Sequence, residues 1–311
     1  MQKEKYDIIV VGGGFAGSAA AISAARQHKK VILIEKYNCM GGAAVFDLVN
    51  PFMRYWTYSG KNRERLELSC GLFSEIMRRM EEAGGLCPDD KRYFNEEILK
   101  YVLNHMALES GVHLLYQAYV TGVDNDNGHI RSVTVSSVSG SFELYADYYI
   151  DATGDANLAF LAGCPFRLGR EADGLCQPMT LCFRLGNVKK AEKASLFARI
   201  NRLYKQFHAE GKFQNPREDV LVFRTVSENI YHFNTTRIIR LNPTDVYDVT
   251  KAEIEARNQI FELYAFLREN FEEFHDSILL TSGIQIGVRE SRMIDGNYTL
   301  TKEDLLTCTQ F

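Results

Sequence analysis

The stretch Asp7-Ile-Ile-Val-Val-Gly-Gly-Gly-Phe-Ala-Gly17 decides the fold of this chain. Its apolar run, residues 7–11, is rich in β-branched side chains and predicts a strand buried on both faces. Residues 18–27 are rich in alanine and contain no helix breaker, so they predict a helix. Residues 30–35, Lys-Val-Ile-Leu-Ile-Glu, predict a second buried strand. Together these segments predict one right-handed βαβ unit with parallel strands.

The glycines between the first strand and the helix have the spacing G-x-G-x-x-G, at Gly12, Gly14 and Gly17. Such a motif, placed between a strand and a helix, binds a dinucleotide. Gly12 permits the tight turn, Gly14 lets a diphosphate approach the backbone, and Gly17 lets the helix pack closely. The phosphates then meet unpaired N–H groups at the start of the helix. Glu35, at the end of the second strand, predicts a contact with the ribose hydroxyls and disfavours a 2′-phosphate.

The rest of the chain predicts a larger sheet and a second unit. Residues 112–150 alternate with period two and contain turn signals, so they predict a β-meander, with its last strands at 142–145 and 148–152. Helices are expected over 64–84 and 94–110 and, further on, over 191–210 and from Thr250, where Thr250 and Glu253 fit a capping box. The expected fold class is α/β: a Rossmann-like domain with a parallel sheet and a β-meander, plus a second α+β domain. The expected boundaries are 1–174 for the first domain, 175–284 for the second, and 285–311 for an incomplete return to the first.

Composition narrows the possible functions. The 311 residues are 46% hydrophobic and 24% charged, with a net charge of −4, so no binding to nucleic acid or to an anionic membrane surface is expected. The apolar run after Met1 stops at Gly12, too early for a signal peptide or membrane span, and a cytoplasmic location is expected. The seven cysteines are scattered and show no CxxC spacing, so neither a disulfide framework nor a metal site is expected.

Three segments carry a family resemblance: residues 7–17 with Ile34-Glu-Lys36, Met40-Gly-Gly-Ala-Ala44, and Tyr149-Ile-Asp-Ala-Thr-Gly-Asp155. They resemble the FAD-binding elements of enzymes similar to glutathione reductase and fumarate reductase. Further matching segments are Leu48–Phe52, Leu161–Pro165, Gly169–Glu171, Asp173–Gly174, Ile286–Arg292 and Leu300–Asp304. With these, the whole chain resembles the FAD-dependent oxidoreductases that are grouped with heterodisulfide reductase.

The resemblance and the motif together imply FAD as the cofactor. The expected cofactor-binding residues are Gly12, Gly14, Phe15, Ala16, Gly17, Glu35, Lys36, Gly41, Gly42, Ala43, Val120, Thr153, Gly154 and Asp155. By the resemblance, the backbone of Val120 would contact the adenine, and Gly154 and Asp155 would lie by the ribityl chain or the diphosphate. Relatives have a C-terminal segment that covers the flavin, and nothing like it precedes Phe311, so a truncated chain is expected.

Catalytic residues are harder to assign. Arg289 could clamp a substrate carboxylate or stabilise an anionic reduced flavin, or it could form an ion pair with Glu290 at a domain interface. His208 and His232 lie in the second domain and could transfer protons, although structural roles are more common for such residues.

The function expected from these patterns is that of an FAD-dependent oxidoreductase acting on an unidentified small molecule. Because there is only one G-x-G-x-x-G motif, electrons are expected to reach the flavin from the bound substrate or from an electron-transfer partner protein. Two alternatives stay open: an NAD-dependent dehydrogenase, and a truncated FAD-binding remnant or partner-dependent subunit without activity of its own. The substrate itself is not indicated.

Overall fold

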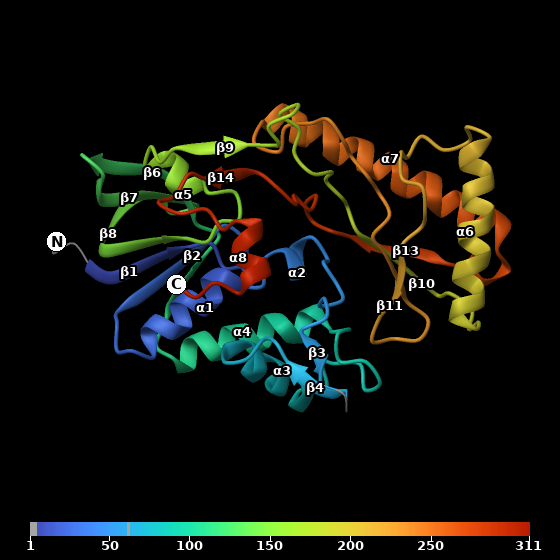
Figure 1. Ribbon diagram of the computed structural model, residues 1–311, viewed down its shortest axis with the longest axis horizontal. Helices are drawn as coiled ribbons and strands as arrows, with labels where there is room; N and C mark the ends of the chain where they lie inside the picture. The colour runs from blue at the N-terminus through green and yellow to red at the C-terminus, as the bar shows by residue number, and fades with distance from the viewer. Residues whose placement is uncertain (1–4, 61–62) are drawn as a thin grey trace.

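The computed structural model describes residues 5–60 and 63–311, which form two lobes (Figure 1). One lobe is built around a six-stranded sheet and contains the N-terminus, and the other is built around a four-stranded sheet. Among the described residues, no helix combines the length and the apolar character that crossing a membrane requires.

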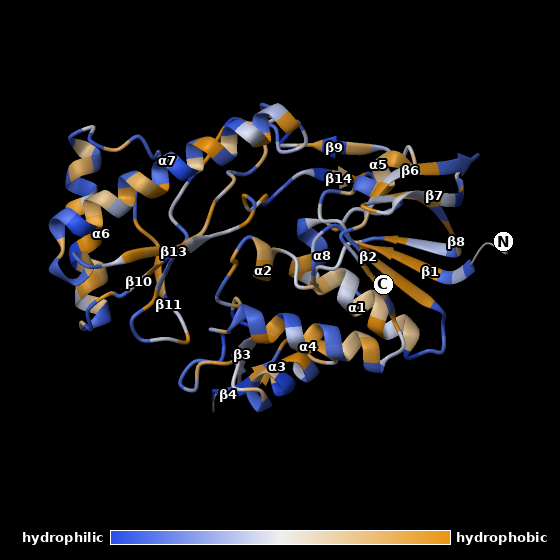
Figure 2. Ribbon diagram, turned by 180° about the vertical axis from the view of Figure 1, so that it is seen from behind, coloured by the Kyte–Doolittle hydropathy of each residue, from blue (hydrophilic) through white to orange (hydrophobic). Residues whose placement is uncertain are grey.

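The six-stranded sheet combines a parallel part with the meander. Its strands, in spatial order, are β5 (His113–Tyr116), β2 (Val31–Glu35), β1 (Lys5–Val11), β8 (Gly140–Asp151), β7 (His129–Ser137) and β6 (Tyr119–Asp126). The first four run parallel, and β7 and β6 continue from β8 in antiparallel pairs. This confirms the predicted parallel sheet with a β-meander. The central strands β1 and β2 are apolar, as the orange colour in Figure 2 shows.

Each face of this sheet has its own apolar core. On one face lie the helices α1 (Phe15–Ala25), α3 (Leu72–Glu82) and α4 (Glu96–Glu109), which bury Ile22, Ile76 and Leu99 against Val10 and Leu33. On the other face, Ile9 and Ile34 pack against side chains of the meander such as Val133 and Val135. The alternation of β1 and β2 residues between these two cores explains why both strands are apolar throughout.

Shorter elements complete the first lobe. They are α2 (Ala43–Phe46), β3 (Trp56–Ser59), β4 (Glu64–Glu67), α5 (Asn157–Leu161), β9 (Phe166–Leu168), β14 (Arg292–Ile294) and α8 (Lys302–Thr307). Because β14 pairs with β9, the chain returns from the second lobe to the first near its C-terminal end.

The second lobe consists of an antiparallel sheet covered by long helices. Its strands, in spatial order, are β11 (Val222–Arg224), β12 (Tyr231–Phe233), β10 (Phe183–Gly186) and β13 (Ile278–Ser282), and its helices are α6 (Lys193–Ala209), α7 (Val246–Asn270) and the short 3-10 helix η1 (Glu272–Phe274). One apolar core, between Met179 and Ile286 in the sequence, joins the helices to the sheet. We retain the expected boundaries at residues 174/175 and 284/285 as a proposal.

Three expectations about these elements were wrong. The strands expected at 142–145 and 148–152 form the single strand β8, because no glycine or proline interrupts the chain between them. The helix expected over 64–84 begins only at Leu72, after Gly71 with its φ of 65°, and residues 64–67 pair with β3 instead.

The third is the start of α7, which lies before Thr250. The carboxylate of Asp245 caps the helix by accepting from the N–H groups of Tyr247 (2.9 Å) and Asp248 (3.0 Å). The hydroxyl of Thr250 lies inside the helix and donates to the carbonyl of Val246 at 2.7 Å.

Candidate functional site: a groove between the glycine-rich loops and the second lobe

The carboxyl ends of β1, β2 and β8 meet at one edge of the six-stranded sheet. The N–H of Gly12, just after β1, donates to the carbonyl of Ile34 in β2 at 2.8 Å. The N–H of Ala152, just after β8, donates to the carbonyl of Val11 in β1 at 2.8 Å. The loops that follow the three strands therefore lie side by side, where open α/β sheets bind their ligands.

Glycines allow the first loop to pack this closely. Gly12 has a φ of 102°, and a Cβ there would lie 2.3 Å from the carbonyl oxygen of Ala152. A Cβ at Gly17 would lie 1.8 Å from the carbonyl oxygen of Gly12, so α1 starts against the turn itself. At Gly14, by contrast, the nearest atom to an added Cβ is the Cα of Gly42, at 3.8 Å. No side chain caps α1 at Gly14, so its first N–H groups are available to an anion.

The carboxylate of Glu35 is held at the start of the same loop. Its Oε2 accepts from the N–H of Gly13 at 2.6 Å, and its Oε1 accepts from the N–H of Tyr37 at 2.9 Å. The residue is only 5% exposed. A carboxylate oxygen accepts more than one hydrogen bond, so Glu35 retains acceptor capacity for a ribose hydroxyl.

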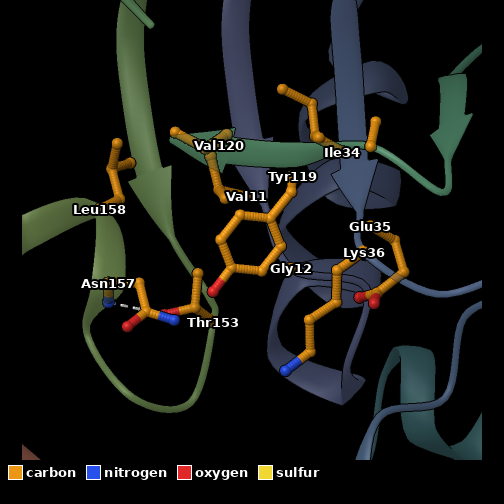
Figure 3. Close-up of a pocket in the computed structure, with 11 residues that line it drawn as sticks. Val11, Gly12, Ile34, Glu35, Lys36, Tyr119, Val120, Thr153, Asn157 and Leu158 are labelled. Atoms are coloured by element: carbon orange, nitrogen blue, oxygen red, sulfur yellow. Dashed lines mark hydrogen bonds between the residues drawn. The ribbon is translucent and has the colours of Figure 1, made fainter. Parts of the chain in front are cut away.

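Two adjoining hollows follow this edge of the sheet. The smaller, drawn in Figure 3 and called here the inner hollow, is lined by Val11, Gly12, Ile34, Glu35, Lys36, Ala118, Tyr119, Val120, Thr153, Asn157 and Leu158. The larger, called here the groove, has a cavity volume of about 290 Å³. Both include Gly12, Glu35, Lys36 and Thr153, so they form one continuous channel along the edge. The volume of the groove is close to the lower end of the range of about 300–1,000 Å³ that is typical of ligand sites.

Most residues expected to bind the cofactor line this channel. They are Gly12, Gly14, Glu35, Lys36, Gly42, Ala43, Val120, Thr153, Gly154 and Asp155. Four others lie behind it and act as supports: Phe15 packs on Phe52 with ring centroids 5.7 Å apart, Ala16 and Gly17 form the first turn of α1, and the N–H of Gly41 donates to Gly13 at 2.9 Å. The structure thus brings the predicted residues together at one site. Phe15, Ala16 and Gly17 contribute the backbone of α1 to this site, and Gly41 supports the turn at Gly13.

Tyr119 and Asn157 also line the channel, and sequence reasoning missed both. In Figure 3 the ring of Tyr119 lies across the inner hollow, with its hydroxyl toward Thr153. The side chain of Thr153 is fixed by its own loop, since its Oγ1 donates to Asp151 at 2.7 Å and accepts from the N–H of Asn157 at 2.9 Å. Tyr119 directly precedes Val120, which was expected to bind the cofactor. Its position at the end of a strand was the only feature of the sequence that could have indicated a role at the site.

The groove also receives side chains from the second lobe and from the segment that follows it, which sequence reasoning missed. The amide of Gln285 donates to Oδ1 of Asp47 at 2.7 Å, and the hydroxyl of Tyr37 donates to the amide oxygen of Gln285. Asp47 is 5% exposed, and burial raises the pKa of its carboxyl to about 7. The hydrogen bond from Gln285 and the charge of Lys36 oppose this rise.

Arg289 lies near the channel but in a neighbouring hollow that it shares with Gly154. Its Nη2 donates to Oδ1 of Asn234 at 3.4 Å. Among the described residues no ion pair joins Arg289 to Glu290, whose carboxylate accepts from the N–H of Gln177 at 2.9 Å. Arg289 is thus a cation beside the loop that follows β8.

Comparisons with known proteins agree with this geometry. The model of the family described as FAD dependent oxidoreductase matches residues 7–311. Digeranylgeranylglycerophospholipid reductase from Methanocella arvoryzae is 29% identical over 164 residues, which are 49% of this chain and 40% of that protein. The tRNA uridine 5-carboxymethylaminomethyl modification enzyme MnmG from Flavobacterium johnsoniae is 30% identical over 144 residues, which are 43% of this chain and 22% of that protein. The matched regions therefore span less than half of these curated relatives.

Solved structures share the fold. The myxobacterial chondrochloren halogenase CndH matches with a TM-score of 0.52 and 14% identity, over 95% of this chain and 66% of that one. The p-nitrophenol 4-monooxygenase PnpA from Pseudomonas putida matches with a TM-score of 0.50 and 13% identity, over 94% of this chain and 70% of that one. At such low identity these matches show the fold alone.

A family match over nearly the whole chain identifies the cofactor as FAD, and the chain as an enzyme, and it leaves the NAD-dependent alternative without support. The channel fits this cofactor. Gly14 has no side chain to block a diphosphate, and the first N–H groups of α1 behind it are not capped by any side chain. The chain belongs to the FAD dependent oxidoreductase family.

Proposed function

We propose that this oxidoreductase uses its flavin to oxidise or reduce a small molecule that binds between the two lobes. The observation that supports the proposal is the lining of the groove. Its first side consists of the glycine-rich loops, and its second side consists of Pro243, Val249, Glu253, Gln285, Ile286 and Val288 from the second lobe and the segment that follows it. A substrate that reaches the groove from the second lobe would approach the cofactor.

We assign the cofactor contacts as follows. Gly14 and the first N–H groups of α1 would hold the diphosphate, because the helix dipole favours negative charge there. Glu35 would accept from the ribose, and the backbone of Val120, beside the inner hollow, would contact the adenine. Gly42, Ala43 and Asp155 continue along the groove toward the second lobe.

FAD supplies the redox chemistry, and the protein supplies orientation, electrostatics and proton control. Asp47 is the residue best suited to the last task, because its raised pKa lets Oδ2 hold or release a proton near neutral pH while Oδ1 accepts from Gln285. Arg289 adds a positive charge near the loop after β8, which favours an anionic substrate group or a reduced flavin.

The substrate class and the electron partner are separate questions. The activities in the names of the relatives belong to those proteins, and low coverage gives no reason to transfer them. Electron supply by the substrate or by a partner protein, dependence on such a partner, and a cytoplasmic location stay predictions from the sequence.

The proposal is tested by the visible spectrum of the purified chain and by the variant Gly14→Leu. Because Gly14 has an ordinary φ of −65° and open space, leucine fits the backbone and fills the path of the diphosphate. We expect the flavin absorbance to be lost while the free energy of unfolding of the flavin-free chain stays unchanged. The matched control is Gly296→Leu, at an exposed glycine outside the channel. Retention of flavin by Gly14→Leu would contradict the assigned diphosphate site.

A further inference from the structure

The sheet of the second lobe has a polar side that the apolar core does not use. In β10 and β12, Phe183, Leu185, Tyr231 and Phe233 all belong to the core shared with the helices. Successive side chains of a strand point to opposite faces, so the residues between them, Arg184 and His232, point to the other side. The register makes Arg184 and His232 direct cross-strand neighbours.

This polar side meets the first lobe at the start of α4. The guanidinium of Arg184 forms an ion pair with Oε1 of Glu96. The same Glu96 oxygen accepts from the amide of Asn50 at 2.7 Å, and that amide also donates to the carbonyl of Phe94 at 2.8 Å. Asn50, Glu96, Arg184 and His232 therefore form one cluster between the lobes, called here the interlobe cluster.

The interlobe cluster is buried but has several polar atoms without partners. His232 is 1% exposed, and Asn50 and Glu96 are each 6% exposed. Within the described residues, Oδ1 of Asn50, Nε of Arg184 and both ring nitrogens of His232 have no hydrogen-bond partner. Buried polar atoms in folded proteins are almost always paired, because leaving one unpaired is costly. Four such atoms in one place indicate that a further molecule pairs with them.

The charges of the interlobe cluster favour a neutral molecule. The charge of Arg184 is offset by Glu96. Burial, together with the neighbouring Arg184 charge, lowers the pKa of His232 to about 3, so its imidazole is neutral at physiological pH. An anion in the interlobe cluster would therefore be repelled by Glu96 and would find no unpaired positive charge. A cation there would be repelled by Arg184.

The free atoms match a group that both donates and accepts. Nε of Arg184 is a donor, Oδ1 of Asn50 is an acceptor, and a neutral imidazole offers one of each. A hydroxyl group has one proton to donate and two lone pairs to accept, so it can pair with both donors and with one of the two acceptors. A carboxylate has no proton for Oδ1 of Asn50, and an ammonium has no acceptor for Nε of Arg184.

The interlobe cluster lies beside the groove. Cys182 is two residues before Arg184 and therefore on the same side of its strand. The carbonyl of Cys182 accepts from the N–H of Gly283 at 2.9 Å, and a Cβ at Gly283 would lie 3.3 Å from the Cα of Asp47, which lines the groove. Asn50 follows Asp47 after two intervening residues in the same loop. The cluster is thus linked to the wall of the groove through Gly283 and through the loop from Asp47 to Asn50.

We propose that Asn50, Arg184 and His232 form a subsite that binds a neutral hydroxyl group of the substrate. This inference rests on the proposed function, in which a small molecule binds between the lobes, and it names the chemical class of that molecule as an alcohol.

The test is a titration of the flavin-loaded full chain carrying ¹⁵N-labelled histidine. The probes are benzyl alcohol, benzoate and benzylamine, which share a ring and differ in the polar group. We expect the ring nitrogens of His232, identified by His232→Gln, to shift saturably with benzyl alcohol at a concentration at least tenfold lower than with the charged probes. Equal or tighter binding of benzoate, or no response of His232 to benzyl alcohol, would overturn the subsite.

The variant Arg184→Lys removes the Nε–H donor and retains a charge that can pair with Glu96. We expect it to weaken binding of benzyl alcohol at least tenfold without loss of flavin. The matched control is Arg237→Lys, which changes an arginine of the same lobe paired with the exposed Glu218. Unchanged binding in Arg184→Lys also overturns the subsite.

Flavin content is measured in the same samples by visible absorbance, which separates the two proposals. A chain that retains flavin but shows no alcohol-specific response keeps the proposed function and loses the subsite. A chain without flavin refutes the cofactor assignment, while the response of His232 still reports on the subsite.

Discussion

Replacing Asp47 with asparagine should change how the stability of the protein depends on pH. Asp47 is buried beside the groove, and its Oδ1 accepts from Gln285 at 2.7 Å. Burial raises its pKa from 3.8 to about 7, and the nearby carboxylates of Asp155 and Glu253 add to the rise. The charged form is thus disfavoured in the folded protein, and asparagine keeps the shape without the charge.

The size and sign of the effect follow from linkage. One pKa unit corresponds to about 1.4 kcal/mol, so a rise from 3.8 to about 7 corresponds to about 4 kcal/mol. Well below pH 4 the carboxyl of Asp47 is protonated in both the folded and unfolded chains, so Asp47 does not lower the free energy of unfolding there. As the pH rises toward 7 the unfolded chain ionises first, so stability is lost over this range. Relative to the wild type, Asp47→Asn should therefore gain up to about 4 kcal/mol between pH 4 and 8.

The measurement is urea unfolding of the flavin-free chain, followed by circular dichroism at several pH values from 4 to 8. His232 acts in the opposite direction, because its pKa is lowered from 6.5 to about 3 and its contribution is lost as the pH falls below 6.5. Subtracting the wild type from Asp47→Asn removes that contribution. Asp295→Asn, at an exposed aspartate, controls for the loss of one charge. A difference between Asp47→Asn and the wild type that does not vary with pH would refute the reasoning.

Three further variants test the site. Gly42→Ala, at a φ of 52° and with a Cβ 2.7 Å from the Cα of Gly14, should destabilise the chain by about 1–3 kcal/mol in urea unfolding and weaken flavin retention. Glu96→Ala, which leaves the largely buried Arg184 side chain unpaired, should cost about 3–5 kcal/mol in the same assay, and a cost below about 1 kcal/mol would contradict a stabilising ion pair. Arg289→Ala should lower the flavin midpoint potential by about 30 mV, the equivalent of about 1.4 kcal/mol, in a spectroelectrochemical titration; an unchanged potential would favour a purely structural role.

The cofactor side of the site was predictable because its determinants are local. A strand, a glycine turn and a helix follow each other within residues 7–27, and at Gly12 and Gly17 the backbone approaches so closely that only glycine fits. Parallel strands place their carboxyl ends at the same edge, so the loop with Thr153 had to meet the loop with Gly12. Errors arose where two local signals competed, as when Asp245 rather than Thr250 capped α7.

The substrate side was not predictable in the same way, because its contacts join distant parts of the sequence. Asp47 and Gln285 are 238 residues apart, and Arg184 and Glu96 are 88 residues apart. Nothing local in either segment indicates the partner. Such pairs depend on how one lobe packs against the other, and periodicity carries no information about that packing.

A weaker signal for the substrate side was nevertheless present in the short strands. His232 stands between Tyr231 and Phe233, and Arg184 stands between Phe183 and Leu185. A polar residue between two large apolar residues in a strand lies on the face opposite to the apolar core. If that face is also buried, the polar residue must pair with another element or with a ligand, because a buried unpaired polar atom is costly. Here Arg184 finds Glu96 across the interface, while His232 finds no partner within the described residues. The imidazole of His232 is therefore the group that most directly reports whether the interface between the lobes binds a substrate.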